Sequence, residues 1–133
     1  MKAATSVVYT IPVPPSANKI WRHIISSSGK PRTLKSRNYL AWLEDVNLAL
    51  RLQGIREFNG PVKVSLQVEG GRDFEGARDL DNLWKPTLDA LRQIGILKED
   101  NVRHVVELHA YYIPVPGPTR CLVTIQSLGE LRT

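Results

Sequence analysis

Two carboxylates stand two residues apart in the segment Arg78-Asp79-Leu80-Asp81-Asn82-Leu83. Side chains two positions apart point the same way in an extended segment, so Asp79 and Asp81 are expected to lie close together. Like charges at short range repel each other unless a cation lies between them. Mg²⁺ prefers carboxylate oxygens and usually takes one or two of them, with water and phosphate oxygens as its other ligands. This pair of acids therefore indicates a divalent-metal site.

Other readings of the same residues stay open. Asp81 or Asn82 is a natural N-cap for a helix that begins nearby, and a cap accounts for one of them without a metal. Asp81, Lys85 and Asp89 are spaced four residues apart and share one helix face if the helix begins early. For Lys85 the alternative role is a surface ion pair with either acid, worth well under ~1 kcal/mol. The acids Glu99 and Asp100 precede a predicted strand; one of them would complete a triad, although turn residues need no function.

The charge of the chain is unevenly distributed. The 133 residues hold 18 Lys and Arg against 13 Asp and Glu, a net charge of +5. Residues 1–43 contain basic residues and no acid, because Glu44 is the first acid in the sequence. Such asymmetry favours a polyanionic partner, nucleic acid before membrane. Metal-holding acids in a protein whose other half is basic suggest metal-dependent cleavage of a phosphodiester, with the basic half holding the backbone.

Several classes of protein are not expected. The single cysteine, Cys121, argues against a disulfide scaffold and a thiolate zinc cluster. No apolar run approaches the roughly 20 residues that a membrane-spanning helix needs. The apolar stretch near the N-terminus is too short for a signal peptide. Neither a Walker A motif nor GxGxxG is present, so no nucleotide cofactor is expected. We therefore expect a cytoplasmic protein that does not act at a membrane.

The elements that must position these residues follow from periodicity and turn residues. Alternating or β-branched segments predict strands at 5–11, 62–68, 102–113 and 121–126. Ser36 as N-cap and Gly54 as terminator bound a predicted helix over 37–53, with Tyr39, Leu43, Val46 and Leu50 as its buried face. A second helix is predicted over 83–94, with Trp84, Leu88 and Leu91 as its apolar stripe. Residues 12–34 are expected to form a long basic loop.

The order β-α-β-α-β-β predicts a single domain over residues 1–133. Its fold class is α+β (mixed α/β), with the helices packed on one sheet.

Three segments, taken in order, resemble one family. They are Pro14-Pro15-Ser16-Ala17-Asn18 followed by Trp21-Arg22, then Arg78-Asp79-Leu80-Asp81-Asn82-Leu83-Trp84-Lys85-Pro86 through Asp89-Ala90-Leu91, and finally Glu99-Asp100-Asn101-Val102 after Gly95. Together they are similar to the RusA family of Holliday junction resolvases, small proteins mostly encoded by prophages. The central segment with the spaced acidic pair is the specific part of the match.

The resemblance implies a Mg²⁺-dependent endonuclease, with Mn²⁺ as a substitute, that acts on four-way DNA junctions in DNA recombination and repair. A homodimer would make two symmetrical nicks. The family's metal ligands carry over to Asp79, Asp81 and Asp100, and its catalytic lysine carries over to Lys85. The DNA-positioning candidates are basic residues: Lys19, Arg22, Lys30, Arg32, Lys35, Arg37 and Arg78. We expect the strand at 102–113 and Trp42, which lies off the apolar stripe, to contact the dimer partner.

Two other functions compete with junction resolution. One is a junction-binding protein with little catalysis, although the presence of all three carboxylates and the lysine argues against it. The other is a metal-dependent nuclease for other branched or single-stranded DNA. The 70–78 loop bears on this choice, since its acids offset its arginines where the family is often very basic.

Overall fold

Four strands form the central sheet of the computed structural model, which describes residues 5–15, 21–25, 27–70, 80–98 and 103–129. The strand order is β1-β6-β4-β5, and β4 and β5 are the parallel pair. Parallel neighbours need a crossover connection, and a helix supplies it here. The strands are β1 (Ser6–Ile11), β4 (Val62–Gly70), β5 (Val105–Pro114) and β6 (Arg120–Ser127).

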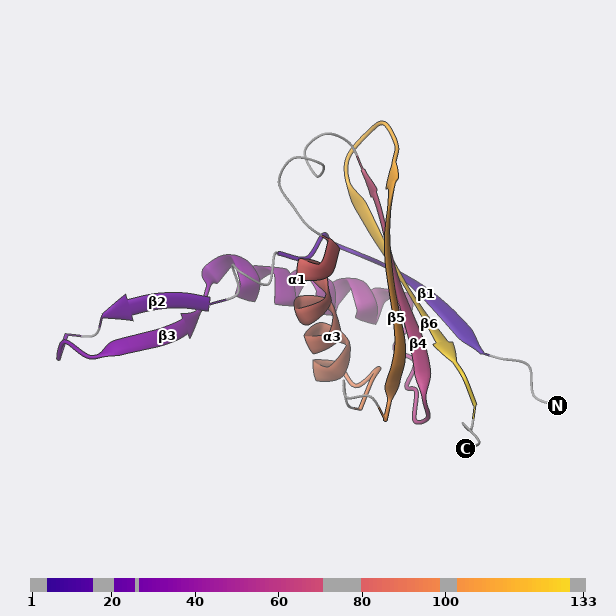
Figure 1. Ribbon diagram of the computed structural model, residues 1–133, viewed down its shortest axis with the longest axis horizontal. Coiled ribbons are helices and arrows are strands. Elements are labelled where there is room, and N and C mark those ends of the chain that lie inside the picture. Colours follow the sequence, from indigo (N-terminus) through magenta and orange to yellow (C-terminus); the bar gives the residue numbers. More distant parts are fainter. Residues whose placement is uncertain (1–4, 16–20, 26, 71–79, 99–102, 130–133) are drawn as a thin grey trace.

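One face of this sheet carries the core. Along β4, Val62, Val64, Leu66 and Val68 are fully buried and alternate with half-buried residues, as the sequence predicted. Both main helices, α1 (Arg37–Gln53) and α3 (Trp84–Gln93), lie on the same side of the sheet (Figure 1). The predicted α+β domain with helices on one sheet is confirmed.

Helix α1 begins and ends where its sequence signals lie. The Ser36 hydroxyl accepts a hydrogen bond from the backbone N–H of Tyr39 at 3.2 Å, which satisfies one of the free donors of the first turn. Gly54 follows the last turn with φ +96°, a conformation that favours glycine. The predicted bounds of 37–53 are confirmed.

The buried stripe of α1 differs from the predicted one. It consists of Tyr39, Trp42, Val46 and Leu50, whereas Leu43 is only half-buried. Trp42 is buried, and its indole N–H donates to the Pro12 carbonyl at 3.0 Å. The expectation that Trp42 contacts a dimer partner is therefore wrong. A helix allows spacings of both three and four residues on one face, and here the larger ring takes the buried position.

The buried face of α3 also differs from the predicted apolar stripe. Trp84 and Leu88 are half-buried, while Pro86, Thr87, Ala90 and Leu91 are buried. The Thr87 hydroxyl donates to the Leu83 carbonyl at 2.7 Å, which allows a polar side chain to be buried within the helix. A short 3₁₀ helix, η2 (Leu80–Leu83), directly precedes α3.

The predicted loop at 12–34 is wrong over much of its length. Strands β2 (Trp21–Ile25) and β3 (Pro31–Lys35) pair antiparallel as a separate two-stranded sheet, with Trp21 opposite Lys35. This hairpin projects away from the main sheet (Figure 1). Its strands are short and lack a clear alternation of apolar residues, so the sequence pattern did not reveal them. Of the helices in the described residues, none is long and apolar enough to cross a membrane.

Candidate active site

The start of α3 presents the first predicted site residue to solvent. In η2, Leu83 is fully buried and Leu80 packs against the core, so this turn is anchored next to β5. Asp81 lies between these two leucines and is exposed. The N-cap position of α3 is occupied by Leu83, and no side chain caps the helix. The alternative role of Asp81 or Asn82 as the cap of α3 is therefore wrong, and the Asp81 carboxylate is left for other partners.

Lys85 lies one helical turn beyond Asp81. It is the second residue of α3, and its side chain is 62% exposed. Pro86 follows in the first turn, where the N–H that proline lacks would have no partner within the helix. Asp81, in η2, and Lys85, in α3, are both exposed on either side of the junction between the two helices. Lys85 Nζ lies 3.4 Å from Asp89 Oδ1, so the ion pair predicted as its alternative role is present.

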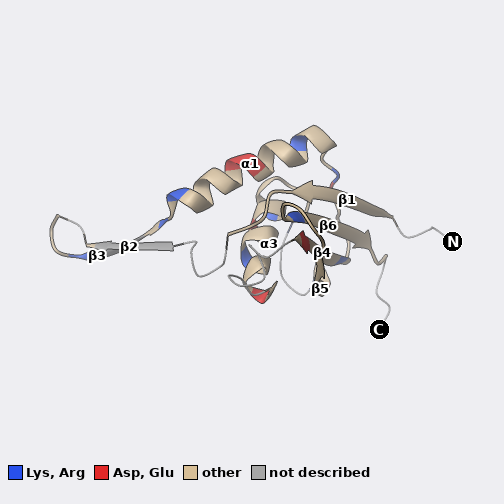
Figure 2. Ribbon diagram, turned by 90° about the horizontal axis from the view of Figure 1, so that it is seen from above, with Lys and Arg blue, Asp and Glu red and all other residues tan. Residues whose placement is uncertain are grey.

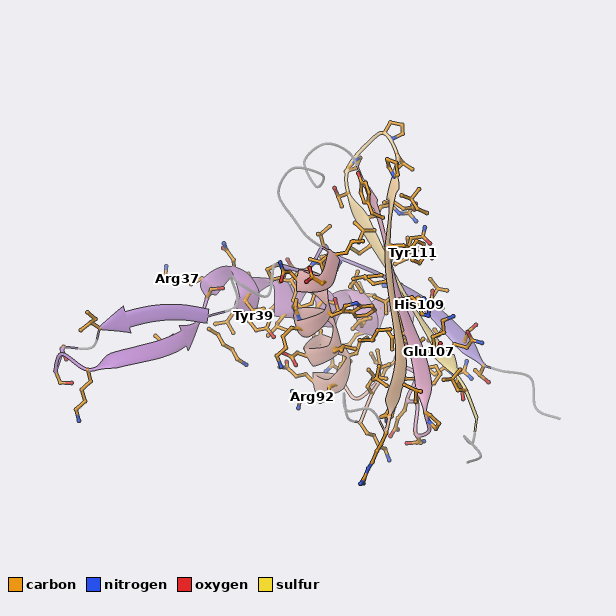
Figure 3. All side chains as sticks on the ribbon, viewed as in Figure 1. Arg37, Tyr39, Arg92, Glu107, His109 and Tyr111 are labelled. Carbon is orange, nitrogen blue, oxygen red and sulfur yellow. The ribbon has the colours of Figure 1, made fainter. Side chains whose placement is uncertain are left out.

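Asp89 is the buried acid of this helix. Its side chain is 12% exposed, and Oδ1 also lies 3.7 Å from the Arg92 guanidinium. Burial raises the pKa of the Tyr39 hydroxyl, from α1, above its usual 10.0; the nearby charge of Asp89 acts in the same direction, and the charge of Arg92 opposes them. Figure 3 labels Tyr39, on α1, and Arg92, on α3.

Of the three predicted metal ligands, only Asp81 lies within the described residues. Asp79 and Asp100 lie outside the described residues, so their position beside Asp81 stays a prediction. Within the described ranges, no three Asp, Glu, His or Cys side chains gather as a metal site would require. The structure therefore shows that Asp81 and Lys85 are both exposed near the start of α3, and it does not test Asp79 or Asp100 as ligands.

Basic residues cluster on the hairpin and at its base. Lys30, Lys35 and Arg37 are all exposed. Figure 2 shows basic positions in blue on the hairpin and near the start of α1. The register places Arg22 opposite Leu34 and Arg32 opposite Ile24, and the side chains of both arginines are outside the described set. Two further predicted DNA contacts, Lys19 and Arg78, also lie outside the described residues.

Sequence reasoning missed the effect of the Asp89 charge on the Tyr39 hydroxyl. The apolar period identified Tyr39 only as a core residue, and the motif identified Asp89 only as a neighbour of Lys85. The one available signal was an acid directly before Ala90 and Leu91, on the side of α3 that becomes buried. Which hydroxyl lies near that acid depends on how α1 packs against α3, and no local pattern encodes it.

An exposed carboxylate and lysine near the start of α3, in a protein that also carries a basic hairpin, suit an enzyme that acts on a phosphodiester backbone. Residues 11–126 match the family model described as Endodeoxyribonuclease RusA, so the chain belongs to the RusA family of endonucleases. The resemblance predicted from its motifs is confirmed.

Curated relatives cover nearly the whole chain. A protein of Enterobacteria phage 82 is 31% identical over 122 residues, which span 91% of this chain and 94% of that protein. A protein of Shigella sonnei is 29% identical over 121 residues, with the same coverage of both chains, and so is one of Escherichia coli. All three bear the name crossover junction endodeoxyribonuclease RusA. The phage relative agrees with the expected link to prophages, and the endonuclease names confirm that the chain is an enzyme.

Proposed function

We propose that this protein is a Mg²⁺-dependent endonuclease that resolves four-way DNA junctions by paired, symmetrical nicks. The observation that carries the proposal is the exposed pair Asp81 and Lys85 at the uncapped start of α3, within the acidic motif of a RusA-family chain. The names of the relatives support the choice of a crossover junction as substrate. Such an activity belongs to DNA recombination and repair in the cytoplasm of a bacterial cell, for a host-encoded or phage-encoded protein.

The chemistry of the donor set fits a hard divalent cation. Asp79, Asp81 and Asp100 would hold the ion, and the Asp81 carboxylate is exposed and not used as a helix cap. When bound, Mg²⁺ polarises the scissile phosphate and lowers the pKa of an attacking water. Lys85 contributes a fixed positive charge beside the phosphate oxygens, where negative charge develops in the transition state. Mn²⁺ has similar ligand preferences and would substitute.

The hairpin and its base would position the DNA. Lys30, Lys35 and Arg37 offer exposed positive charge on an element that extends away from the helices and sheet. Phosphate contacts of this kind orient a duplex without reading its sequence, and they weaken as salt concentration rises. Lys19, Arg22, Arg32 and Arg78 complete the proposed set.

Paired nicks need two equivalent sites, so the proposal includes a two-fold homodimer. Strand β5 is an edge of the central sheet, and its large apolar side chains Val106, Leu108, Tyr111 and Ile113 are exposed. An edge strand with exposed apolar residues readily pairs with another chain. We assign part of the dimer contact to β5, in agreement with the role expected for 102–113.

The test is a cleavage assay on a synthetic four-way junction, with Mg²⁺ and with a chelator. Wild type is expected to nick two opposing strands only when Mg²⁺ is present, and Asp79→Asn is expected to bind the junction without nicking it. Binding without nicks by wild type would support a junction-binding protein instead. Comparable cutting of flaps, forks and linear duplex would support a nuclease with a broader substrate range. Cleavage by Asp79→Asn would overturn the metal assignment.

A further inference from the structure

The tip of the hairpin carries a large apolar side chain that is open to solvent. Ile25, the last residue of β2, is 77% exposed, although isoleucine is among the residue types that proteins bury most often. It pairs with Pro31 in the register, so the last pair of the ladder consists of two apolar residue types. This end of the hairpin is the one farthest from the central sheet (Figure 1). We propose that the tip is a wedge that inserts Ile25 between base pairs at the centre of a four-way DNA junction.

The charge around Ile25 favours DNA over a second copy of this chain as its partner. Lys30 is exposed in the connection between the strands, and Arg32 and Lys35 follow in β3. The hairpin contains no acid, because Glu44 is the first acid in the sequence. A second copy, with its net charge of +5, would meet these cations with like charge, whereas DNA presents phosphates along each strand. Proteins that kink DNA insert Ile, Leu or Pro between base steps in this way, with basic residues beside them.

The connection between the two strands is narrow. It consists of Ser-Ser-Ser-Gly-Lys, so apart from Lys30 it holds no side chain larger than that of serine. Ser27, Ser28 and Gly29 are all exposed. Gly29 has φ +80°, a conformation that favours glycine, and a Cβ there would meet no atom within 4 Å. A tip of small residues can approach stacked bases closely, with Ile25 as its large apolar group.

The centre of a junction is the place where such a wedge costs least. Insertion of an apolar side chain requires neighbouring bases to unstack, and this cost is lowest where pairing or stacking is already disturbed. The duplex is interrupted at the branch point, whereas an intact linear duplex has to be kinked. Removal of the exposed Ile25 side chain from water then favours binding. The cations of the hairpin contact phosphates of either DNA, so Ile25 would supply preference for the junction.

Ile25→Ser tests the wedge, with Leu52→Ser as its matched control. Leu52, near the end of α1, is 78% exposed and lies off the hairpin. With a chelator present to prevent cleavage, Ile25→Ser is expected to weaken junction binding about tenfold and binding to a linear duplex by less than about twofold. Leu52→Ser should leave both affinities within about twofold of wild type. Unchanged junction binding by Ile25→Ser, equal losses on junction and duplex, or equal losses in both variants would overturn the proposal.

The fluorescence of 2-aminopurine measures unstacking directly, because this base brightens when it loses its stacking neighbours. It replaces adenine at one branch-point position at a time, with chelator and with enough protein to bind all of the junction. Wild type is expected to raise the fluorescence about threefold at one or more positions, and Ile25→Ser to give less than about half of that rise. Ile25→Leu keeps a large apolar side chain and should retain the rise. No rise with wild type, or an equal rise with Ile25→Ser, would contradict the wedge.

The wedge rests on the function proposed above, and the outcomes separate the two. If the rise depends on Ile25 while wild type makes no nicks with Mg²⁺, the wedge stands and the nuclease proposal fails. If wild type nicks junctions and Ile25→Ser binds and nicks them equally well, the nuclease proposal stands and the wedge fails. Sedimentation of the DNA-free protein tests the other partner. Ile25→Ser is expected to sediment as wild type does, and a smaller species would show that the tip contacts a second copy instead.

Discussion

The hairpin and the start of α3 differ in how firmly the rest of the protein holds them. In the proposed function, the hairpin positions the DNA and the start of α3 carries the catalytic residues. The hairpin is a two-stranded sheet that stands apart, and none of its described side chains is buried. The start of α3 is anchored by the fully buried Leu83 and by Leu80, which packs against the core. A hairpin of this kind is marginally stable on its own. Contact with phosphates tolerates such looseness, whereas catalysis requires groups held within a fraction of an ångström.

Among the substitutions that test this difference, the one at Asp81 is expected to change the cleavage rate most. Asp81→Asn removes a metal-binding charge while keeping the size of the side chain, so cleavage is expected to fall by about 10³-fold or more. Junction binding should stay within about threefold of wild type, because the phosphate contacts lie elsewhere. Cleavage of a labelled junction and a gel-shift titration measure the two quantities. Cleavage within tenfold of wild type would remove Asp81 from the site.

Lys85→Met is expected to have the next largest effect. Loss of one charge that stabilises the transition state costs about 10²-fold in rate, with little change in junction affinity. Lys98→Met is the matched control, since Lys98 is similarly exposed and pairs only weakly with Glu57 at 3.9 Å. Single-turnover rates under saturating enzyme compare the two variants. An equal response to both substitutions would show that Lys85 has no special role.

Substitutions in the hairpin and at its base should show the opposite behaviour, with loss of affinity and little change in rate at saturation. The double variant Lys30→Ala/Arg37→Ala is expected to weaken junction binding about tenfold. It should also reduce the slope of log K against log salt by about 2, because each lost phosphate contact contributes about 0.9. Arg51→Ala/Lys98→Ala is the charge-matched control on the body of the protein. If both double variants weaken binding equally, net charge rather than the hairpin would be responsible.

The smallest predicted effect concerns stability at high pH. The raised pKa of Tyr39 means that the folded protein holds this proton more tightly than the unfolded chain, whose value is near 10.0. The resulting stability is fully present below pH 10 and is lost as the pH rises through the higher pKa of the folded state. Urea unfolding between pH 9 and pH 11 should therefore show a steeper loss of stability for wild type than for Tyr39→Phe. Identical slopes would show that Tyr39 does not contribute.

Local signals predicted the elements that carry their own pattern. Ser36, Gly54 and the apolar spacing defined α1, and strict alternation defined β4. The hairpin was not predicted, because its short strands pair with each other and carry Arg and His between apolar residues. The choice of Trp42 over Leu43 as a core residue depends on how α1 packs, which the period alone does not determine.

The same distinction applies to the site. The motif identified Asp81 and Lys85 because their chemistry depends on residue type and short spacing. The effect of the Asp89 charge on the Tyr39 hydroxyl acts between helices that are distant in the sequence, so only the packing of α1 against α3 reveals it.

The central claim is tested most directly by mapping the nicks that wild type makes in a synthetic four-way junction with Mg²⁺, beside a linear duplex of the same sequence. The account predicts two nicks at symmetrical positions in opposing strands of the junction, and none in the duplex. It also predicts that chelation of Mg²⁺ abolishes the nicks while the junction stays bound. Junction binding without nicks, or equal cutting of junction and duplex, would contradict it.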